Sequence, residues 1–505
     1  MSELFHPDRL QRLNDLRQAG VDPYPPRSPE NREWAQPLVE AADARSGETV
    51  TICGRILGRR GYGKLAFLDL HDQSGKIQAC AQKNKLPEAE FALLKKINLG
   101  DFVAIRGELG RTKMGEATVF AESLQLLSKS LAEPPEKWHG LSDVELRARM
   151  RYVDLFSNAE IRQRFQRRSA VLAAMRRVME AEGYLEVDTP VLHPIYGGAN
   201  ARPFRTHHNT LDMPLYLRIA PELYLKRLLV GGLERVYEFA RVFRNEGISV
   251  RHNPEFTMLE FYGAYGDYRS MAALTESLVV AAAEAAGCRQ EDGSLSTEFR
   301  GSSYDLTPPF PKLKYRELFV EHAGFEPEDR DRVANRCREL SLEVELDSEY
   351  GYWKAVNRLF EEEVESKLTG PVFVMDYPAA ISPLAKPCPE HPGWAERFEF
   401  FLGGMELANA FSELNDPHLQ MENFQRQVQD KDPEMPNEVD WDYVRALAYG
   451  LPPAGGCGIG IDRLVMVLLG VDNIREVLLF PLLRPEVGMV EEDSATDSAE
   501  AASAP

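Results

Sequence analysis

The chain has 505 residues, which exceeds the length of one typical domain, and its hydrophobic content of 44% is enough for a sizeable core. The formal charge of -20 argues against unspecific affinity for nucleic acid, because Lys and Arg supply most of that binding. The start shows no signal peptide, and no apolar run is long enough to span a bilayer. We therefore expect a soluble, cytoplasmic protein without a membrane partner.

The N-terminal 135 residues are predicted to form a lead and a small β-barrel. Residues 1–47 read as a helix followed by a Pro-rich stretch. From residue 48 to 135, short β-like runs alternate with Gly-containing turns, at 50–56, 65–70, 76–80, 102–107 and 117–121. Five such strands predict an OB-fold.

Barrels of this kind bind single-stranded nucleic acid through basic residues and exposed aromatic rings. Arg59, Arg60 and Lys64 lie just before Phe67 in this segment, which fits that use. A barrel that binds no nucleic acid fits the same pattern, because a fold does not fix a function.

After a linker at 136–148, residues 149–485 are predicted to form a larger domain. It opens with a long helix from about Ile161 to Glu182, followed by Gly183 and a strand that stops at Pro190. A helix that ends at a glycine and a strand that ends at a proline are common in proteins of many functions. Further on, Gly198 lies in a glycine pair and Glu222 stands near the start of a helix.

The stretch from residue 241 to 262 reads as a strand, a polar loop and a returning strand that carry fixed charges. In extended chain, residues two apart share a face, so Arg244 and Glu246 are expected together. The returning strand is expected to present Phe256, Glu260 and Tyr262 on one face. A guanidinium fork matches phosphate or carboxylate oxygens, an aromatic face stacks under a purine, and a carboxylate beside a tyrosine holds an ammonium group. The pattern favours ATP plus an amino acid, whereas a solvated hairpin with surface ion pairs is the alternative.

Carboxylates recur every seven residues at Glu399, Glu406 and Glu413, within otherwise apolar sequence. A glycine pair at 403–404 predicts two strands joined by a turn. Buried charges need partners, and salt bridges to nearby arginines are the alternative to a ligand site.

The strand parity of this hairpin makes a specific structural prediction. Asn409, Phe411 and Glu413 share one face, and Glu406 falls on the other. If Glu406 also faces the site, a bulge near Leu407 or Ala408 must shift the register.

A glycine-rich strand from Gly455 to Gly460 runs directly into an apolar helix with Arg463 in its first turn. Glycines allow close approach of the backbone to a ligand, and this helix start presents positive potential to phosphates. Neither P-loop nor Rossmann spacing is met, so a nucleotide would bind in another way. The last residues, 486–505, are rich in Ala, Ser and acid and are predicted to be a disordered tail.

Three of these segments, 183–190, 241–262 and 455–469, resemble motifs 1, 2 and 3 of the class II aminoacyl-tRNA synthetases, in that order. The wording Phe-Arg-Asn-Glu-Gly followed by Arg-His-Asn-Pro-Glu-Phe resembles the bacterial-type lysyl-tRNA synthetase family. The resemblance runs from about residue 5 to 485. It implies an α+β fold, in which an antiparallel sheet with flanking helices follows an N-terminal five-stranded OB-fold barrel that binds the anticodon.

The resemblance also implies a reaction and its partners. ATP would activate L-lysine to lysyl-adenylate, and lysine would pass to the 3′ end of tRNA(Lys), in a homodimer formed through motif 1. Magnesium, which prefers hard oxygen ligands, would be held on the ATP phosphates by Glu399 and Glu406.

The remaining roles are implied position by position. Arg244 and Arg463 are the expected catalytic residues. ATP is expected to contact Arg244, Glu246, His252, Phe256, Gly460 and Arg463. Lysine is expected to contact Gly198 and Glu222 through its α-amino group, Glu260, Tyr262 and Glu413 through its ε-ammonium, and also Asn409 and Phe411. The anticodon is expected to contact Arg59, Phe67, Gln78 and Glu116.

Rival functions predict different residues at these positions. An aspartate or asparagine enzyme would need a positive or amide-reading residue where Glu260 and Glu413 stand. A relative that lysylates another acceptor usually lacks the barrel. A non-catalytic RNA-binding protein should have lost Arg244, Glu399, Glu406 or Arg463, all of which are present.

Overall fold

The computed structural model of the chain describes residues 5–135, 141, 143–430, 436 and 438–484. The predicted acidic tail and residues 136–140 and 142 of the predicted linker lie outside these residues. The chain divides into two compact units, Met1–Ser142 and Asp143–Pro505. Within the described ranges, no helix combines the length and the apolar character that a membrane crossing requires.

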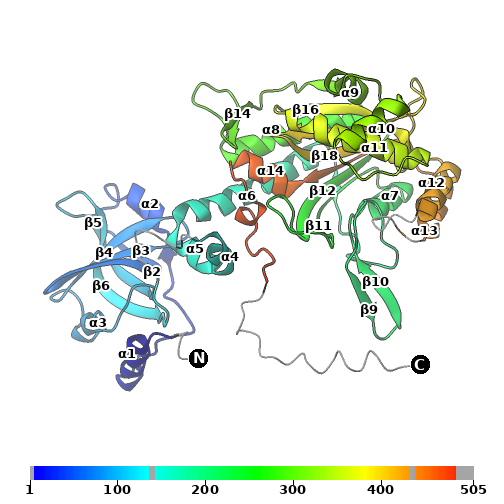
Figure 1. Cartoon of the computed structure of the whole chain (residues 1–505). Coiled ribbons are helices and arrows are strands. Elements are labelled where there is room, and N and C mark those ends of the chain that lie inside the picture. The colour runs from blue at the N-terminus through cyan, green and yellow to red at the C-terminus, as the bar shows by residue number, and fades with distance from the viewer. Residues whose placement is uncertain (1–4, 136–140, 142, 431–435, 437, 485–505) are drawn as a thin grey trace. The chain divides into compact units, whose positions relative to one another are not determined.

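The first unit is a closed β-barrel with short helices (Figure 1). Its elements are α1 (Pro7–Gln18), β1 (Arg32–Glu33), α2 (Ala35–Glu40), β2 (Thr49–Tyr62), β3 (Leu65–His71), β4 (Lys76–Gln82), α3 (Glu88–Leu93), β5 (Phe102–Arg111) and β6 (Ala117–Ser128). The strand order is β1-β2-β3-β4-β6-β5, and pairing of β2 with β5 closes five strands into a barrel. Along β3, buried Ala66, Leu68 and Leu70 alternate with less buried positions, so one face fills the barrel. The predicted OB-fold is confirmed.

The second unit is built on an eight-stranded sheet in the order β15-β16-β17-β18-β19-β12-β11-β7. Its pairings are antiparallel except at β15–β16 and β7–β11 near the two edges. The elements up to β15 are α4 (Val144–Arg149), α5 (Arg151–Ser157), α6 (Ala159–Ala181), β7 (Leu185–Glu186), β8 (Leu192–His193), β9 (Arg205–His208), β10 (Met213–Leu217), α7 (Glu222–Val230), β11 (Arg235–Phe243), β12 (Glu255–Ala264), α8 (Tyr268–Ala286), β13 (Ser296–Phe299), β14 (Ser302–Asp305) and β15 (Lys312–Lys314). The remaining helices and strands are α9 (Tyr315–Ala323), α10 (Arg330–Glu339), α11 (Glu349–Glu363), β16 (Val372–Pro378), β17 (Trp394–Leu402), β18 (Met405–Ser412), α12 (Pro417–Asp430), α13 (Trp441–Ala448), β19 (Ala454–Gly460) and α14 (Ile461–Leu468).

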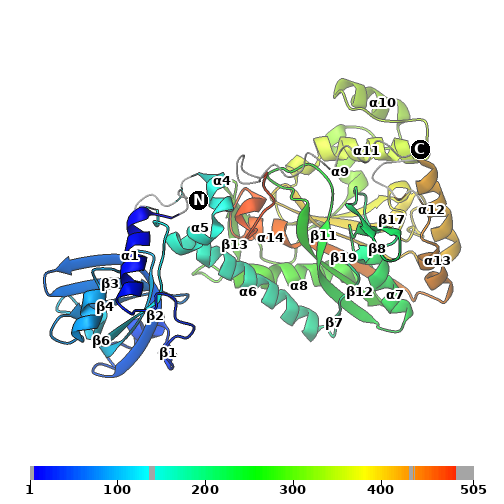
Figure 2. The same ribbon diagram turned by 90° about the horizontal axis from the view of Figure 1, so that it is seen from below.

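The two faces of this sheet have different partners. On one face, apolar residues of α6, α8 and α14 form a continuous core with β12, β17, β18 and β19, and Figure 2 shows α6 and α8 running side by side. On the other face, α7 and α13 cover one part and α9 and α11 cover another, each with its own cluster. The sheet between these two clusters is free to line a site.

The predicted hairpin bulge is confirmed at Leu407. Strands β17 and β18 meet at a turn in which Gly403 and Gly404 both have positive φ. Phe400 pairs with Ala408 and Phe401 with Glu406, which leaves Leu407 as the extra residue. Because Leu407 and Ala408 both pack in the core, Glu406 returns to the face that carries Asn409.

Candidate active site

Two rows of residues cross the open face of the sheet in register. One row runs from Glu399 on β17 through Asn409 on β18 and Gly458 on β19 to Glu260 on β12. The next row runs from Arg397 through Phe411 and Gly456 to Tyr262. Side chains in such rows stand next to each other across the strands. The order in the sheet therefore brings together residues that are more than a hundred positions apart.

Each row has a glycine in the middle, which leaves room for a ligand and for the neighbouring side chains. A Cβ atom on Gly456 would overlap with the carboxylate of Glu413 and the ring of Tyr262. A Cβ atom on Gly458 would lie 3.0 Å from the terminal carbon of Met258. The glycine-rich sequence of motif 3 thus makes the sheet concave here.

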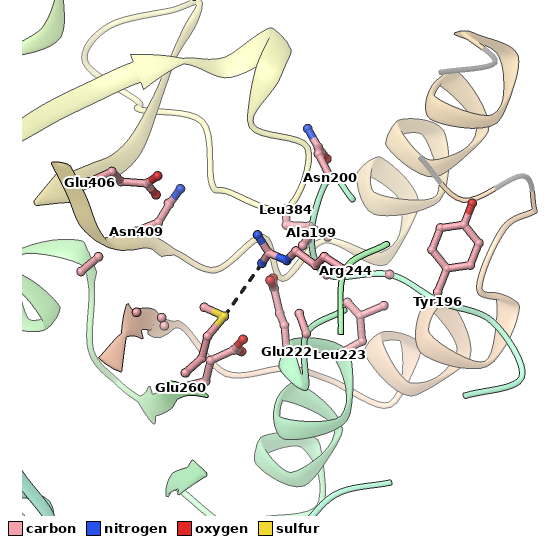
Figure 3. Close-up of a pocket in the computed structure, with 18 of the residues that line it drawn as sticks. Tyr196, Ala199, Asn200, Glu222, Leu223, Arg244, Glu260, Leu384, Glu406 and Asn409 are labelled. Carbon is pink, nitrogen blue, oxygen red and sulfur yellow. Dashed lines mark hydrogen bonds between the residues drawn. The ribbon is translucent and has the colours of Figure 1, made fainter. Parts of the chain in front are cut away.

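The concave face forms a cavity of about 540 Å³. Figure 3 shows Glu222, Glu260 and Arg244 with Asn409 and Glu406 around it. All but one of the residues predicted to bind ATP, lysine or metal line this cavity, namely Gly198, Glu222, Arg244, Glu246, His252, Phe256, Glu260, Tyr262, Glu399, Glu406, Asn409, Phe411, Gly460 and Arg463. The exception is Glu413, which is enclosed behind the wall.

One part of the cavity is cationic. Arg244 lies with its guanidinium carbon 5.1 Å from the ring centroid of Phe256 and donates a long hydrogen bond to Met258 Sδ, 3.9 Å away. Its Nε is buried without a hydrogen-bond partner among the described residues. Although burial lowers the pKa of Arg244, a guanidinium stays charged at neutral pH. A buried, charged donor without a hydrogen-bond partner is a binding site for an anionic oxygen.

His252 lies beside these arginines, and its ring is neutral. Arg463 donates from Nη2 to His252 Nε2 at 3.0 Å, because a guanidinium only donates. The ring proton is then on Nδ1, which lies 2.8 Å from Ser249 Oγ. Burial, together with Arg463 and Arg251, lowers the pKa of His252, which agrees with a neutral ring. Arg463 is therefore aimed by its histidine neighbour and by the Glu406 backbone oxygen, 3.1 Å from Nη1.

The helix that carries Arg463 is tied to the sheet by Asp462. Its carboxylate accepts hydrogen bonds from the Thr257 backbone N–H at 2.8 Å and from Arg168 at 2.6 Å. These bonds join α14 to β12 and α6 at one buried carboxylate. The start of α14, which carries Arg463, is consequently tied to both of these elements.

The opposite part of the cavity is acidic. Glu260 is 3% exposed, and its Oε2 accepts a hydrogen bond from the Tyr262 hydroxyl at 2.9 Å. Burial and the nearby charge of Glu222 raise the pKa of Glu260 to about 8. An ammonium group bound here would favour the ionised carboxylate. This pocket fits a cationic side chain.

Lys226 is a buried charged residue beside this pocket that was not predicted from the sequence. It is enclosed on α7, and its ammonium forms ion pairs with Glu222 and Glu413. Burial alone would lower the pKa of Lys226, but these two carboxylates raise it above its ordinary value. The charges of Glu222 and Glu413 are thus already partly neutralised by Lys226. The signal was present in the sequence, because Glu222 and Lys226 are four residues apart on one helix.

Glu399 and Glu406 are neighbouring carboxylates, and each also pairs with an arginine, Arg397 and Arg463 respectively. Glu399 accepts hydrogen bonds from Tyr377 Oη at 2.8 Å and Arg397 Nη2 at 2.5 Å, which orient it. Burial and the charge of Glu406 raise the pKa of Glu399 to about 7. Within the described ranges, no group of three or more His, Cys, Asp or Glu forms a metal cage. Two carboxylates suit magnesium, which takes one or two of them and completes its shell with phosphate oxygens and water.

Asn409 connects this pair to the rest of the site. Its Oδ1 accepts a hydrogen bond from Arg397 Nε at 3.2 Å, and its Nδ2 donates to Glu399 Oε1 at 3.3 Å. Asn409 was predicted to contact lysine, and it lines the cavity between the acidic pocket and Glu399. Arg397 and Tyr377, which hold Glu399, were not predicted.

Comparison with known proteins identifies the family. A model described as tRNA synthetases class II (D, K and N) matches residues 143–484, and one described as OB-fold nucleic acid binding domain matches residues 50–127. The lysine–tRNA ligase of Carboxydothermus hydrogenoformans is 47% identical over 480 residues, which cover 94% of this chain and 97% of that protein. The chain belongs to the lysine–tRNA ligase family.

Other lysine–tRNA ligases match equally broadly. The enzyme of Pelotomaculum thermopropionicum is 48% identical, and the match covers 94% of this chain and 94% of that protein. The enzyme of Xanthomonas oryzae pv. oryzae is 48% identical, over 90% of this chain and 88% of that protein. The similarity therefore spans both units of this lysine–tRNA ligase family member.

The barrel of this family member carries part of the predicted anticodon set on one face. Phe67 lies opposite Arg60 on β2 and Cys80 on β4, and Gln78 lies two residues from Cys80 on the same face. Gln78 is buried and accepts a hydrogen bond from Thr118 Oγ1 at 2.9 Å.

The two charged members of the predicted set lie differently. Glu116 is exposed and lies 3.4 Å from Lys76 Nζ, at the edge of the Phe67 face. Arg59 lies opposite Leu68, on the other face of the sheet from Phe67, and donates to the Ile97 carbonyl at 2.9 Å. The structure therefore gathers Phe67, Gln78 and Glu116 and sets Arg59 apart.

Proposed function

We propose that this protein uses ATP to activate L-lysine to lysyl-adenylate and then transfers lysine to the 3′ end of tRNA(Lys). The observation that carries the proposal is the cavity itself, which joins an acidic pocket at Glu260 and Tyr262 to a cationic part at Arg244 and Arg463. The ammonium group of lysine fits the acidic pocket, and the phosphates of ATP fit the cationic part. An aspartate or asparagine substrate has no cationic side chain for the acidic pocket.

The proposed reaction relies on positioning and charge. The lysine carboxylate attacks the α-phosphorus of ATP and pyrophosphate leaves. A terminal hydroxyl of tRNA then attacks the adenylate carbonyl, AMP leaves, and the hydroxyl proton is lost. Arg244, whose Nε has no partner among the described residues, is available to the carboxylate and phosphate oxygens. Arg463 is held toward the same space by His252. No side chain forms a covalent bond, because orientation of the two substrates supplies most of the effect.

The metal assignment is part of the same proposal. Glu399 and Glu406 would hold Mg²⁺ together with the ATP phosphates, and the ion would neutralise charge that develops on the departing pyrophosphate. The hydrogen bonds from Tyr377 and Arg397 keep the Glu399 carboxylate in position. The ATP base would stack on Phe256, whose other face is near the Arg244 guanidinium.

A homodimer formed through motif 1 is also proposed. Strand β7 lies at an edge of the large sheet. Around it, Leu185, Val191 and Leu192 are exposed by 53%, 39% and 46%, which is unusual for apolar side chains so close in the chain. A second copy of the chain would cover them. A role in translation would place the dimer in the cytoplasm.

The first test is amino-acid-dependent exchange of pyrophosphate into ATP with the purified protein and each amino acid in turn. We expect exchange with lysine alone. Arg244→Ala should reduce exchange by about 100-fold or more, as loss of one charged transition-state donor does in other enzymes. Arg241→Ala is the matched control, because this arginine on the same hairpin is 44% exposed and pairs only with Glu255 at the surface. Exchange with aspartate or asparagine, or none at all, would reject the proposal.

A further inference from the structure

Lys226 is enclosed beside the acidic pocket, with no exposed side-chain surface. Its ammonium pairs with Glu222 at the start of α7 and with Glu413 just after β18. It also lies 5.0 Å from the ring centroid of Phe411 and 5.9 Å from that of Tyr262. Both rings line the cavity, so Lys226 is adjacent to the cavity wall without lining it.

The net charge of the buried groups around Lys226 is complementary to the two ammonium groups of the substrate lysine. Glu222, Glu260 and Glu413 are all buried, and together they would carry three negative charges. Uncompensated charges at such depth are costly, so at least one carboxylate would otherwise take up a proton. Lys226 cancels one of the three, which leaves a net charge of -2. Lysine brings two ammonium groups, and its carboxylate belongs to the arginine side of the cavity.

We infer that Lys226 is a positioning residue for substrate selection, which holds Glu222 and Glu413 in place and sets the pocket charge to match the two ammonium groups of lysine. The inference rests on the proposed function, because it assigns a determinant of lysine specificity. It concerns a residue that acts through its two carboxylate neighbours and does not itself touch the substrate.

A second enclosed lysine in this chain shows what a purely structural ion pair looks like. Lys129 in the barrel pairs with Asp101, and neither side chain has exposed surface. Asp101 also accepts backbone hydrogen bonds from Asn98 and Ser130, each at 2.8 Å. Its carboxylate is therefore fully used.

The carboxylate of Glu413 is different. Its Oε2 is in contact with the Lys226 ammonium, whereas its Oε1 has no hydrogen-bond donor among the described residues. Gly456, which lines the cavity, lies directly against it. A buried carboxylate with unused acceptor sites at the edge of a cavity is poised for a further cation.

The test replaces Lys226 by methionine, which keeps the length and removes the charge. We expect the lysine KM in pyrophosphate exchange to rise by about 30-fold or more, because truncation of one partner leaves buried charge unpaired. The KM for ATP should stay unchanged. Lys129→Met is the matched control, and it should leave both KM values at the wild-type level. A general loss of stability would not separate the two substrates in this way.

The pH profile and a double variant test the charge mechanism. The titratable groups that face Lys226 are Glu222 on α7, Glu413 after β18, Glu260 and Tyr262 on β12, and Tyr443 on α13. Without the ammonium, a carboxylate here holds a proton at neutral pH. The lysine KM of Lys226→Met should therefore fall more steeply with rising pH than that of the wild type. In a Glu413→Gln background, Lys226→Met should cost less than it does alone, because one of the two carboxylates that lose their partner is gone.

The outcomes separate this inference from the proposed function. If the wild type shows no lysine-dependent exchange, the proposed function fails. If the wild type is active and Lys226→Met has a wild-type lysine KM and pH profile, the inference alone fails. Lys226→Arg should recover part of the lysine affinity, and an equal loss in folded arginine and methionine variants would also overturn it. If Lys226→Met does not fold, Lys226→Gln carries the same measurement.

Discussion

At the residue scale, burial determines when the pocket is ready for a cation. Glu260 is enclosed, its hydrogen-bond donor Tyr262 is neutral, and its pKa is raised to about 8. Below that pH the free protein holds a proton on the carboxylate that lysine needs. The substrate ammonium and this proton compete for the same oxygens.

Lysine affinity should consequently rise with pH. Between about pH 6 and 8 we expect the association constant to increase by up to about tenfold per pH unit and then to level off, because the carboxylate is already ionised above its pKa. Binding below pH 8 should release a proton. Calorimetry in buffers of different ionisation enthalpy measures both the affinity and the proton.

Glu260→Gln provides the control for this pH dependence. The amide cannot titrate, so proton release should decrease and the affinity should be lower at every pH. A wild-type affinity that is flat across this range, or uptake of a proton, would contradict the assignment.

Residue chemistry was predictable where the sequence placed charge in apolar surroundings. Glu399 and Glu406 stand among phenylalanines and glycines, so a role in a site could be predicted for them. Lys226 was not readable in this way, because it precedes Arg227 on a helix and resembles an ordinary surface cation. Only the fold shows that α7 turns this lysine toward β12 and buries it.

At the element scale, the bulge in β18 decides which carboxylates meet. Leu407 and Ala408 both enter the core beneath the sheet, and Glu406 thereby joins Asn409 on the cavity side. If the same residues alternated strictly, with no bulge, Glu406 would point toward α8 and α14. The metal pair of the proposal therefore depends on two successive core-facing residues, Leu407 and Ala408.

Deletion of Leu407 should separate register from side-chain packing. The deletion joins Glu406 directly to Ala408, so Glu406 stays opposite Phe401 on the cavity side, and magnesium-dependent exchange should persist in the folded fraction. Leu407→Ala keeps the bulge and should lower stability by about 2–5 kcal/mol, as other buried leucine truncations do, while exchange also persists in the folded fraction. Thermal unfolding and pyrophosphate exchange on both variants make the comparison. Loss of exchange in a folded deletion variant would contradict this assignment of register.

The hairpins, the barrel strands and the helix of motif 1 were predicted from short-range patterns, and each is present in the structure. The position of the bulge was predicted as well, because strict alternation would have put Glu406 and Asn409 on opposite faces of the strand. The cluster of α9, α10 and α11 on the cavity face was not predicted, because its amphipathic helices carry no motif. Its place over Phe401 depends on pairing between β16 and β17, which only the folded sheet defines.

At the scale of the whole molecule, the two units separate recognition of tRNA from activation of lysine. Each unit has its own core, and the cavity is lined by residues of the second unit alone. The barrel presents Phe67 among polar neighbours on one face. Changes on that face should therefore affect one half-reaction only.

Phe67→Ala should weaken aminoacylation of tRNA(Lys) by about 1–3 kcal/mol in kcat/KM, the range for loss of one base–aromatic stack. Pyrophosphate exchange with lysine should stay at the wild-type rate. Phe67→Tyr keeps the ring and should retain most of the charging activity. Equal losses in both assays would mean that the barrel residue acts through folding.

The concavity of β19 has a genetic consequence. A glycine codon can mutate only to codons for larger residues, so every missense change at Gly456 adds at least one carbon where the Glu413 carboxylate and the Tyr262 ring already lie. The same holds for Gly458, where the added carbon would meet Met258 at 3.0 Å. A gene for this protein thus has no conservative substitution available at the floor of its cavity, and in a population these codons should change only silently.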